Sequence, residues 1–67
     1  MDGHNVASDR RWLDYAGLAA YLGVTPAALR VRVMRGELPT TRLGRRVYFD
    51  RAAIDRLLES RTVPVRT

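Results

Sequence analysis

The chain has 67 residues, with twelve arginines, no lysine, seven acidic residues and no cysteine, and its formal net charge is +5. This length fits one small domain, and the missing cysteines exclude disulfides and thiolate metal sites. The single histidine, His4, cannot build a zinc site, and no apolar run nears the roughly 18 residues of a membrane span. We therefore expect a small cytoplasmic domain with no cofactor, no metal and no membrane partner.

The expected domain spans residues 12–60 and lies between two tails. Residues 1–11 are polar and lack apolar periodicity, and residues 61–67 contain Pro64 and have the composition of a loose tail. We expect both tails to be flexible.

The first helix is predicted over Tyr15–Leu22, after a short extended segment at Trp12 and Leu13. Asp14 is a suitable N-cap, and Gly23 supplies the left-handed residue that ends a helix. The residues at inward-facing spacing are Leu18, Ala19 and Leu22, with Tyr15 at the margin.

A second helix is predicted to start at Thr25-Pro26 and to end at Gly36. Threonine caps the helix, and proline at the first helical position loses no hydrogen bond. Two helices joined by about three residues around a glycine form a helix-turn-helix.

A β-hairpin follows, with strands predicted at Thr41–Leu43 and Arg46–Phe49 around Gly44-Arg45. Glycine in the first place of a two-residue loop favours a type II′ turn. Strand alternation sets Val47 on one face and Tyr48 on the other.

A third helix is predicted over roughly Arg51–Ser60, with Asp50 as its N-cap and with Ile54, Leu57 and Leu58 facing inward. The predicted fold class is therefore α+β and mostly helical: a small winged helix-turn-helix of about three helices and a two-stranded β-hairpin wing.

The net positive charge lies entirely within residues 25–49. This stretch holds six arginines against the single acid Glu37, whereas the arginines and acids of the rest of the chain balance. A helix and a hairpin that carry all the excess charge are typical of a surface that binds a polyanion.

The second helix has an unusual outer face. With Leu29 at zero and about 100° per residue, Val33 falls at about 40°, so these two residues define the buried stripe. The opposite face carries small apolar side chains flanked by arginines, which suits a DNA major groove because arginine bonds guanine or phosphate and small residues allow close approach. The predicted DNA-binding residues here are Thr25, Ala27, Ala28, Arg30, Val31, Arg32 and Arg35, with Thr25 and Arg35 on the DNA backbone. Contact of the same face with another protein is the alternative.

The hairpin supports binding to DNA. Arg45 lies at the turn and Arg46 follows it, where neither can be buried, so the tip suits a minor groove or a flanking phosphate. Tyr48 could bond a phosphate or simply cover the sheet. The predicted DNA-binding residues of the wing are Arg42, Arg45, Arg46 and Tyr48.

From Trp12 to Leu58 the sequence resembles the excisionase-type winged-helix domain, a relative of the DNA-binding domain of MerR regulators. The segments that carry the resemblance are Trp12-Leu13, Tyr21–Thr25, Arg35–Pro39, Gly44–Arg46, and Asp50 before Ile54-Asp55. The resemblance implies that the second helix enters the major groove and that the hairpin enters the adjacent minor groove.

In phage members the resemblance also implies a recombination directionality factor in the bacterial cytoplasm. Such a factor binds repeated sites in an attachment region, bends double-stranded DNA, recruits integrase and promotes prophage excision. Some members assemble head-to-tail on adjacent sites, which implies cooperative binding. The short chain favours an excisionase over MerR regulators, which carry further domains.

Two other functions remain open. One is a small MerR-like transcriptional regulator, and the other is a protein-interaction module that uses the outer face of the second helix. We expect no enzyme and no catalytic residues, because the chain has no cysteine, a single histidine in its N-terminal tail and no pair of carboxylates placed around a pocket. Asp14 and Asp50 are explained as helix caps.

Overall fold

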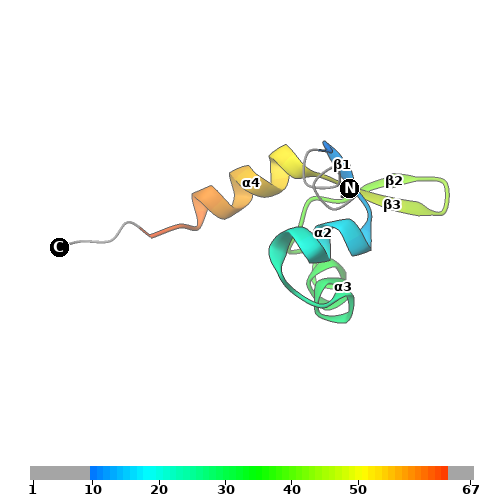
Figure 1. Cartoon of the computed structure of the whole chain (residues 1–67), viewed down its shortest axis with the longest axis horizontal. Coiled ribbons are helices and arrows are strands. Elements are labelled where there is room, and N and C mark those ends of the chain that lie inside the picture. Colours follow the sequence, from blue (N-terminus) through cyan, green and yellow to red (C-terminus); the bar gives the residue numbers. More distant parts are fainter. Residues whose placement is uncertain (1–9, 64–67) are drawn as a thin grey trace, which may run out of the picture.

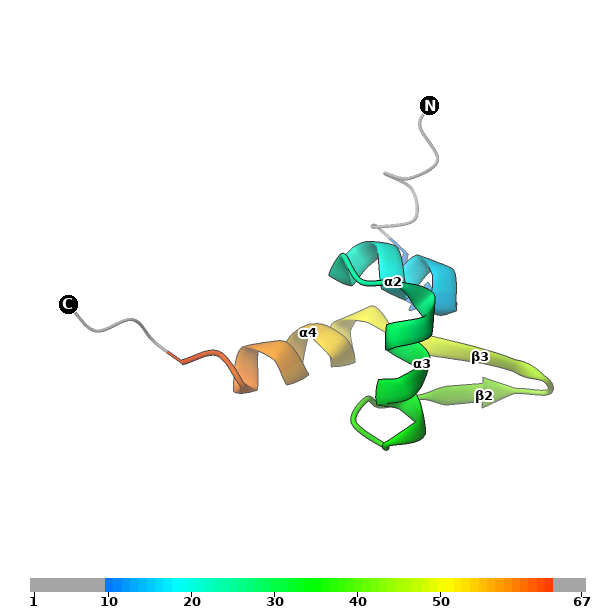
Figure 2. The same ribbon diagram turned by 90° about the horizontal axis from the view of Figure 1, so that it is seen from below.

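The computed structural model describes residues 10–63 and has the predicted α+β architecture. Figure 1 shows a β2–β3 hairpin extending to one side of the α2–α3 pair, and helix α4 extending to the other; Figure 2 shows the same arrangement after a quarter turn. In chain order the elements are β1 (Trp12–Leu13), α2 (Tyr15–Leu22), α3 (Pro26–Met34), β2 (Thr41–Leu43), β3 (Arg46–Asp50) and α4 (Arg51–Ser60). The predicted tail residues 1–9 and 64–67 lie outside the described part.

All three helices begin at the predicted N-cap residues. The Asp14 carboxylate accepts a hydrogen bond from the Gly17 N–H at 2.7 Å, and the Thr25 hydroxyl accepts one from the Ala28 N–H at 3.1 Å. Asp50 accepts from the Ala52 N–H at 3.2 Å. Each cap satisfies a backbone donor that the first turn of a helix leaves without a partner, so the start of each helix follows from local sequence.

Helices α2 and α3 end in the same way, at glycines with a positive φ. Gly23 has φ 74° and Gly36 has φ 71°. In α3 the Gly36 N–H bonds the Val33 carbonyl at 2.9 Å and the Glu37 N–H bonds the Arg32 carbonyl at 3.0 Å. This is the Schellman pattern, which turns the chain back across the last turn of the helix. The helix itself stops at Met34, slightly before the predicted end.

The sheet has three strands instead of the two predicted from the hairpin. Their order is β1-β3-β2, and β1 pairs antiparallel to β3 with Leu13 opposite Phe49. The predicted hairpin register is confirmed, with Leu43 opposite Arg46. Gly44 has φ 60°, whereas Arg45 has a negative φ, because glycines are the only described residues with a positive φ. A positive φ at the first central residue alone is the pattern of a type II′ turn.

One small core joins every element except β2. Its buried residues are Leu13, Leu18, Ala19, Leu29, Phe49 and Ile54. Strand β2 contributes nothing because all three of its residues are exposed. The prediction that Leu58 faces inward was wrong: the residue is 45% exposed and lines an open groove, and α4 extends away from the α2–α3 pair (Figure 1). Because β2 adds no buried residue, the hairpin is attached to the core through β3 only.

Polar contacts attach α4 to the rest of the fold. Asp50 pairs with Arg11, whose Nε lies 3.3 Å from Oδ1, and the Arg51 N–H bonds the Arg11 carbonyl at 2.7 Å. One turn further along, the Tyr21 hydroxyl donates to Asp55 at 2.6 Å, which raises the pKa of Tyr21 above 10.0. These contacts link Arg11, the residue before β1, and helix α2 to the start of α4.

The stability of the fold should depend on pH through Asp50. The Arg11 hydrogen bond lowers the pKa of Asp50 below its ordinary value of 3.8. A carboxylate with a depressed folded pKa contributes stability above its unfolded pKa and loses that contribution as pH falls through the folded pKa. We expect the urea midpoint of the wild type to fall as pH is lowered from 5 toward 2, and Asp50→Asn to flatten this dependence while keeping a capping residue. A midpoint with the same pH dependence in both proteins would contradict this role.

Candidate nucleic-acid interface

The outer face of α3 is exposed, as predicted. Ala27 and Ala28 are exposed, Val31 is 46% exposed and Met34 is 85% exposed. The inner side carries Leu29, which is fully buried, and a half-buried Val33 packed against the core. Small apolar side chains thus line the surface that a groove would receive.

The two arginines at the end of α3 share one carboxylate. Glu37 accepts from Arg32 Nη1 at 3.0 Å and lies 3.8 Å from Arg35 Nη1. The left-handed turn at Gly36 returns the chain over the helix and brings Glu37 to them. Both arginine side chains remain more than 60% exposed. This arrangement was not predicted from the sequence, although the glycine–glutamate order after the helix was its signal.

Arg30 lies on the other flank of α3 and packs against an aromatic ring. Its guanidinium carbon is 5.0 Å from the ring centroid of Tyr15, at the start of α2. Tyr15 in turn meets Phe49 of β3 edge to face, with centroids 5.3 Å apart and planes at 79°. Tyr15 was predicted at the margin of the core, and its contact with Arg30 of α3 was not predicted.

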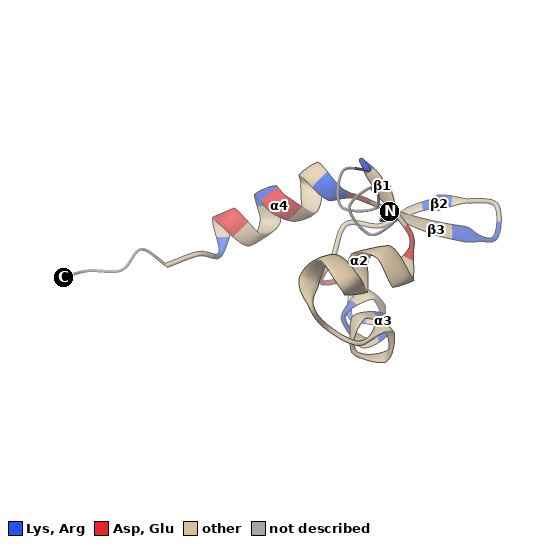
Figure 3. Ribbon diagram, in the orientation of Figure 1, with Lys and Arg blue, Asp and Glu red and all other residues tan. Residues whose placement is uncertain are grey.

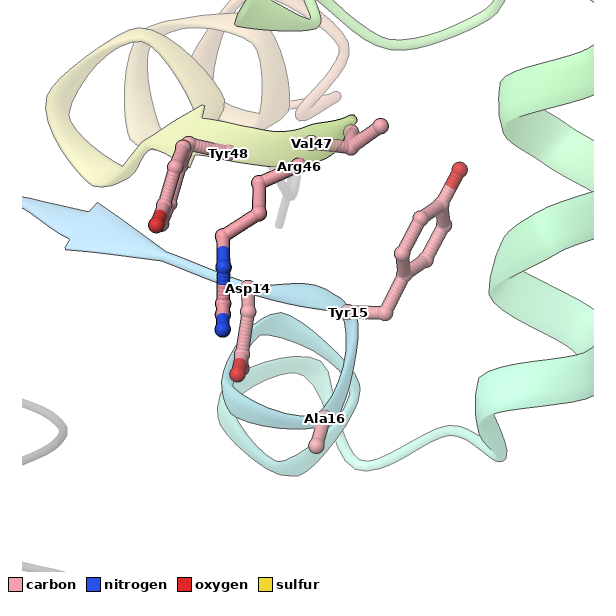
Figure 4. Close-up of a pocket in the computed structure, with 6 residues that line it drawn as sticks. All are labelled: Asp14, Tyr15, Ala16, Arg46, Val47 and Tyr48. Atoms are coloured by element: carbon pink, nitrogen blue, oxygen red, sulfur yellow. The ribbon is translucent and has the colours of Figure 1, made fainter. Parts of the chain in front are cut away.

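The wing arginines divide between the two faces of the hairpin. Arg46 and Tyr48 point to one side of β3 and Val47 to the other (Figure 4). Arg42 lies opposite Val47 in the ladder and so shares its face. Arg42, Arg45 and Arg46 are exposed, and none forms an ion pair with another residue of the range 10–63. Their charge is therefore not neutralised within the described fold.

A shallow pocket lies where the start of α2 approaches β3. Its volume is about 220 Å³, and Figure 4 shows the side chains around it. The lining residues are Asp14, Tyr15, Ala16, Arg46, Val47 and Tyr48. The pocket thus lies between two predicted site residues of the wing, Arg46 and Tyr48, and the N-terminal end of α2.

The helices and strands differ in the charge that they carry. Figure 3 shows arginines on α3 and on both wing strands, no charged residue on α2, and alternating signs along α4. The excess positive charge is thus concentrated on the helix and hairpin, as predicted from the sequence.

A second, apolar groove of about 350 Å³ lies away from the wing, between Leu22, Val24 and Leu38 on one side and Leu57 and Leu58 on the other. Arg32 borders this groove, so it faces α4 and not the wing.

Among the described helices, none combines the length and apolar character needed to cross a membrane.

Two helices joined by a tight glycine turn, followed by a basic hairpin, define a winged helix-turn-helix protein. The chain matches the helix-turn-helix domain family over residues 12–62. It belongs to this family of DNA-binding domains, which includes excisionase-like proteins. The comparisons with curated proteins and with solved structures found no match.

Removing the charge of Glu37 should strengthen DNA binding. Glu37→Gln would release Arg32 and Arg35 from their shared carboxylate. It would also remove a negative charge beside the basic surface, which is formed by the arginines of residues 25–49: Arg30, Arg32, Arg35, Arg42, Arg45 and Arg46. We expect the affinity for duplex DNA to rise by about tenfold at low salt, with a steeper salt dependence. Fluorescence anisotropy with a labelled duplex measures both quantities.

The matched control is Glu59→Gln on α4, which removes the same charge from an exposed position off the basic surface. Both variants are measured on a duplex that binds a single copy, so that contacts between copies do not contribute. We expect a much smaller change from this variant. Weaker binding by Glu37→Gln would show instead that the carboxylate orients the two arginines for contact.

Proposed function

We propose that this protein is a non-enzymatic, sequence-specific DNA-binding protein that acts as an excisionase, or recombination directionality factor. The observation that carries the proposal is the exposed face of α3, where Ala27 and Val31 lie between arginines, next to a hairpin whose arginines have no partner in the described fold. In this proposal α3 enters the major groove and the β2–β3 wing enters the adjacent minor groove.

Each predicted site residue then has a role set by its position. Ala27, Ala28 and Val31 approach the base edges and contact thymine methyl groups, while Arg30 and Arg32 flank them on opposite sides. The Thr25 end of α3 meets a phosphate, because the first turn of a helix presents backbone N–H groups. Arg35 and Arg42 contact the sugar-phosphate backbone. Arg45 and Arg46 form the tip of the wing, with Tyr48 beside Arg46.

The excisionase role rests on the family and on the size of the surface. One winged helix buries only about 600–1,000 Å² of protein surface on DNA, so a single copy binds weakly and several copies on adjacent repeats supply specificity. The arginines of one wing and the acids Asp55 and Glu59 on α4 of the next copy have opposite charge and suit head-to-tail assembly. The assembled copies bend the attachment region and recruit the phage integrase in the cytoplasm of the bacterial host.

Two alternatives keep the same fold but change the partner or the outcome. A small MerR-like transcriptional regulator would use the same surface at a promoter. A protein-interaction module is favoured by one observation, the 85% exposure of Met34 beside Val31 on α3. Such a module would not bind duplex DNA at low salt.

The salt dependence of binding tests the proposed surface. About six phosphate contacts predict a slope near −5 for log affinity against log salt. We expect Arg45→Ala to weaken binding to every duplex equally and to lower the slope by about 1. Arg56→Ala on α4 removes the same charge off the basic surface and should leave both quantities nearly unchanged. Binding of wild type that is independent of salt, or absent at low salt, would overturn DNA binding through this surface.

The assembly and the recombination role have a separate test. Titration of duplexes that carry one, two or three copies of the site should show an affinity per site that rises with the number of copies. Addition of the protein to integrase and a supercoiled plasmid with a candidate attachment region should increase excision. Tight, non-cooperative one-to-one binding at physiological salt contradicts the array, and unchanged excision contradicts the directionality role while leaving DNA binding intact.

A further inference from the structure

Tyr15 occupies the junction between α3 and the β2–β3 wing, although it belongs to neither. It is the first residue of α2. Its ring packs edge to face on Phe49, whose side chain is fully buried, so the ring rests on the core and not on solvent. Figure 4 shows the side chain rising from α2 toward α3, with Val47 of β3 nearby and the hydroxyl at its outer end.

Arg30 of α3 lies over a face of this ring. The guanidinium carbon lies 5.0 Å from the centroid of Tyr15, a separation at which the cation is attracted to the ring. A stacked arginine keeps its donors, which point outward in the plane of the guanidinium group. Within residues 10–63 Arg30 forms no ion pair, whereas Arg32 and Arg35 at the end of the same helix share Glu37.

The Tyr15 hydroxyl also has no hydrogen-bond partner among the described residues. The other tyrosine of α2 differs in this respect, because the Tyr21 hydroxyl donates to Asp55 at 2.6 Å. A phenol whose ring is fixed by the core, with an unused O–H beside an unused guanidinium group, forms a pair of donors without a protein acceptor. Two such donors suit the oxygen atoms of a phosphate.

The docking proposed above brings a phosphate to this place. When a helix occupies the major groove and a hairpin occupies the neighbouring minor groove, one sugar-phosphate strand runs between them. The protein surface between α3 and the wing must face that strand, and Tyr15 with Arg30 forms this surface.

We propose that Tyr15 is a DNA-contacting residue that positions Arg30, and that the two together bind a phosphate of the strand separating the two grooves. This proposal rests on the proposed DNA-binding function. It assigns Arg30 to the DNA backbone and leaves base recognition to the residues at the centre of the outer face, Ala27 and Val31. Phosphate contacts of this kind set the register of the protein on DNA without reading sequence.

The deciding variant is Tyr15→Phe, which keeps the ring and removes the hydroxyl. We expect its affinity to fall by about tenfold, equally on a preferred duplex and on a random duplex, with no change in salt slope because the lost donor is uncharged. Arg30→Ala should also weaken both duplexes equally, but it should lower the slope by about 1. Fluorescence anisotropy at several salt concentrations measures affinity and slope together.

A double-mutant cycle tests whether the ring positions Arg30. Tyr15→Leu removes the platform, so Arg30→Ala should cost less in the Tyr15→Leu background than in the wild type. The control is Tyr21→Phe, which removes a hydroxyl from the same helix at a site bonded to Asp55 and should leave DNA affinity unchanged. Thermal unfolding of each variant shows whether it is folded at the temperature of the titration.

Three outcomes would overturn the proposal. If Tyr15→Phe binds as tightly as the wild type, the hydroxyl does not contact DNA, and only this inference fails. If Arg30→Ala selectively removes preference among sequences, Arg30 reads a base. If the cycle is additive, the ring does not position the arginine. Failure of the wild type itself to bind DNA would instead remove the proposed function along with this inference.

Discussion

The buried side chain of Phe49 connects the β2–β3 hairpin to the helices of this small domain. Its side chain is fully buried, its backbone pairs with Leu13 of β1, and its ring meets Tyr15 of α2. Strand β2 adds no buried residue, so the wing is held to the helices through β3 alone. The angle between α3 and the hairpin, which decides whether one can enter a major groove while the other enters a minor groove, therefore depends on how Phe49 packs. Loss of a large buried aromatic side chain costs about 3–5 kcal/mol, comparable with the whole stability expected of a core this small.

Backbone geometry and electrostatics are linked at the end of α3. The positive φ of Gly36 allows the Schellman turn, and this turn brings Glu37 back to Arg32 and Arg35. The opposite flank has no carboxylate partner for Arg30, which stacks on Tyr15 instead. The arginines at the two flanks of α3 therefore differ: Arg30 stacks on Tyr15, which lies near Val47 of the wing, whereas Arg32 and Arg35 share the Glu37 carboxylate. This difference favours contact with DNA at the side of the helix that adjoins the wing.

Much of the fold could be predicted because its signals are local. Asp14, Thr25 and Asp50 cap their helices within two or three residues along the chain, and Gly23, Gly36 and Gly44 adopt conformations that other residues rarely accept. The third strand was missed because a strand of two residues has too little alternation to be recognised. The exposure of Leu58 was missed because periodicity shows which face of α4 is apolar but not how far the body extends beneath it. The contact between Tyr15 and Arg30 joins residues that are far apart in sequence and match no short motif.

The sequence by itself determined where the helices begin and end, the turn of the hairpin, and the concentration of positive charge in residues 25–49, because capping, glycine conformation and composition act over a few neighbouring residues. Only the tertiary structure decided that the outer face of α3 stays exposed beside the wing, and that Tyr15 of α2 lies between them and stacks on Arg30. These features depend on packing around Phe49 between segments distant in the chain, and hydrophobic periodicity carries no information about the partner that a buried face meets.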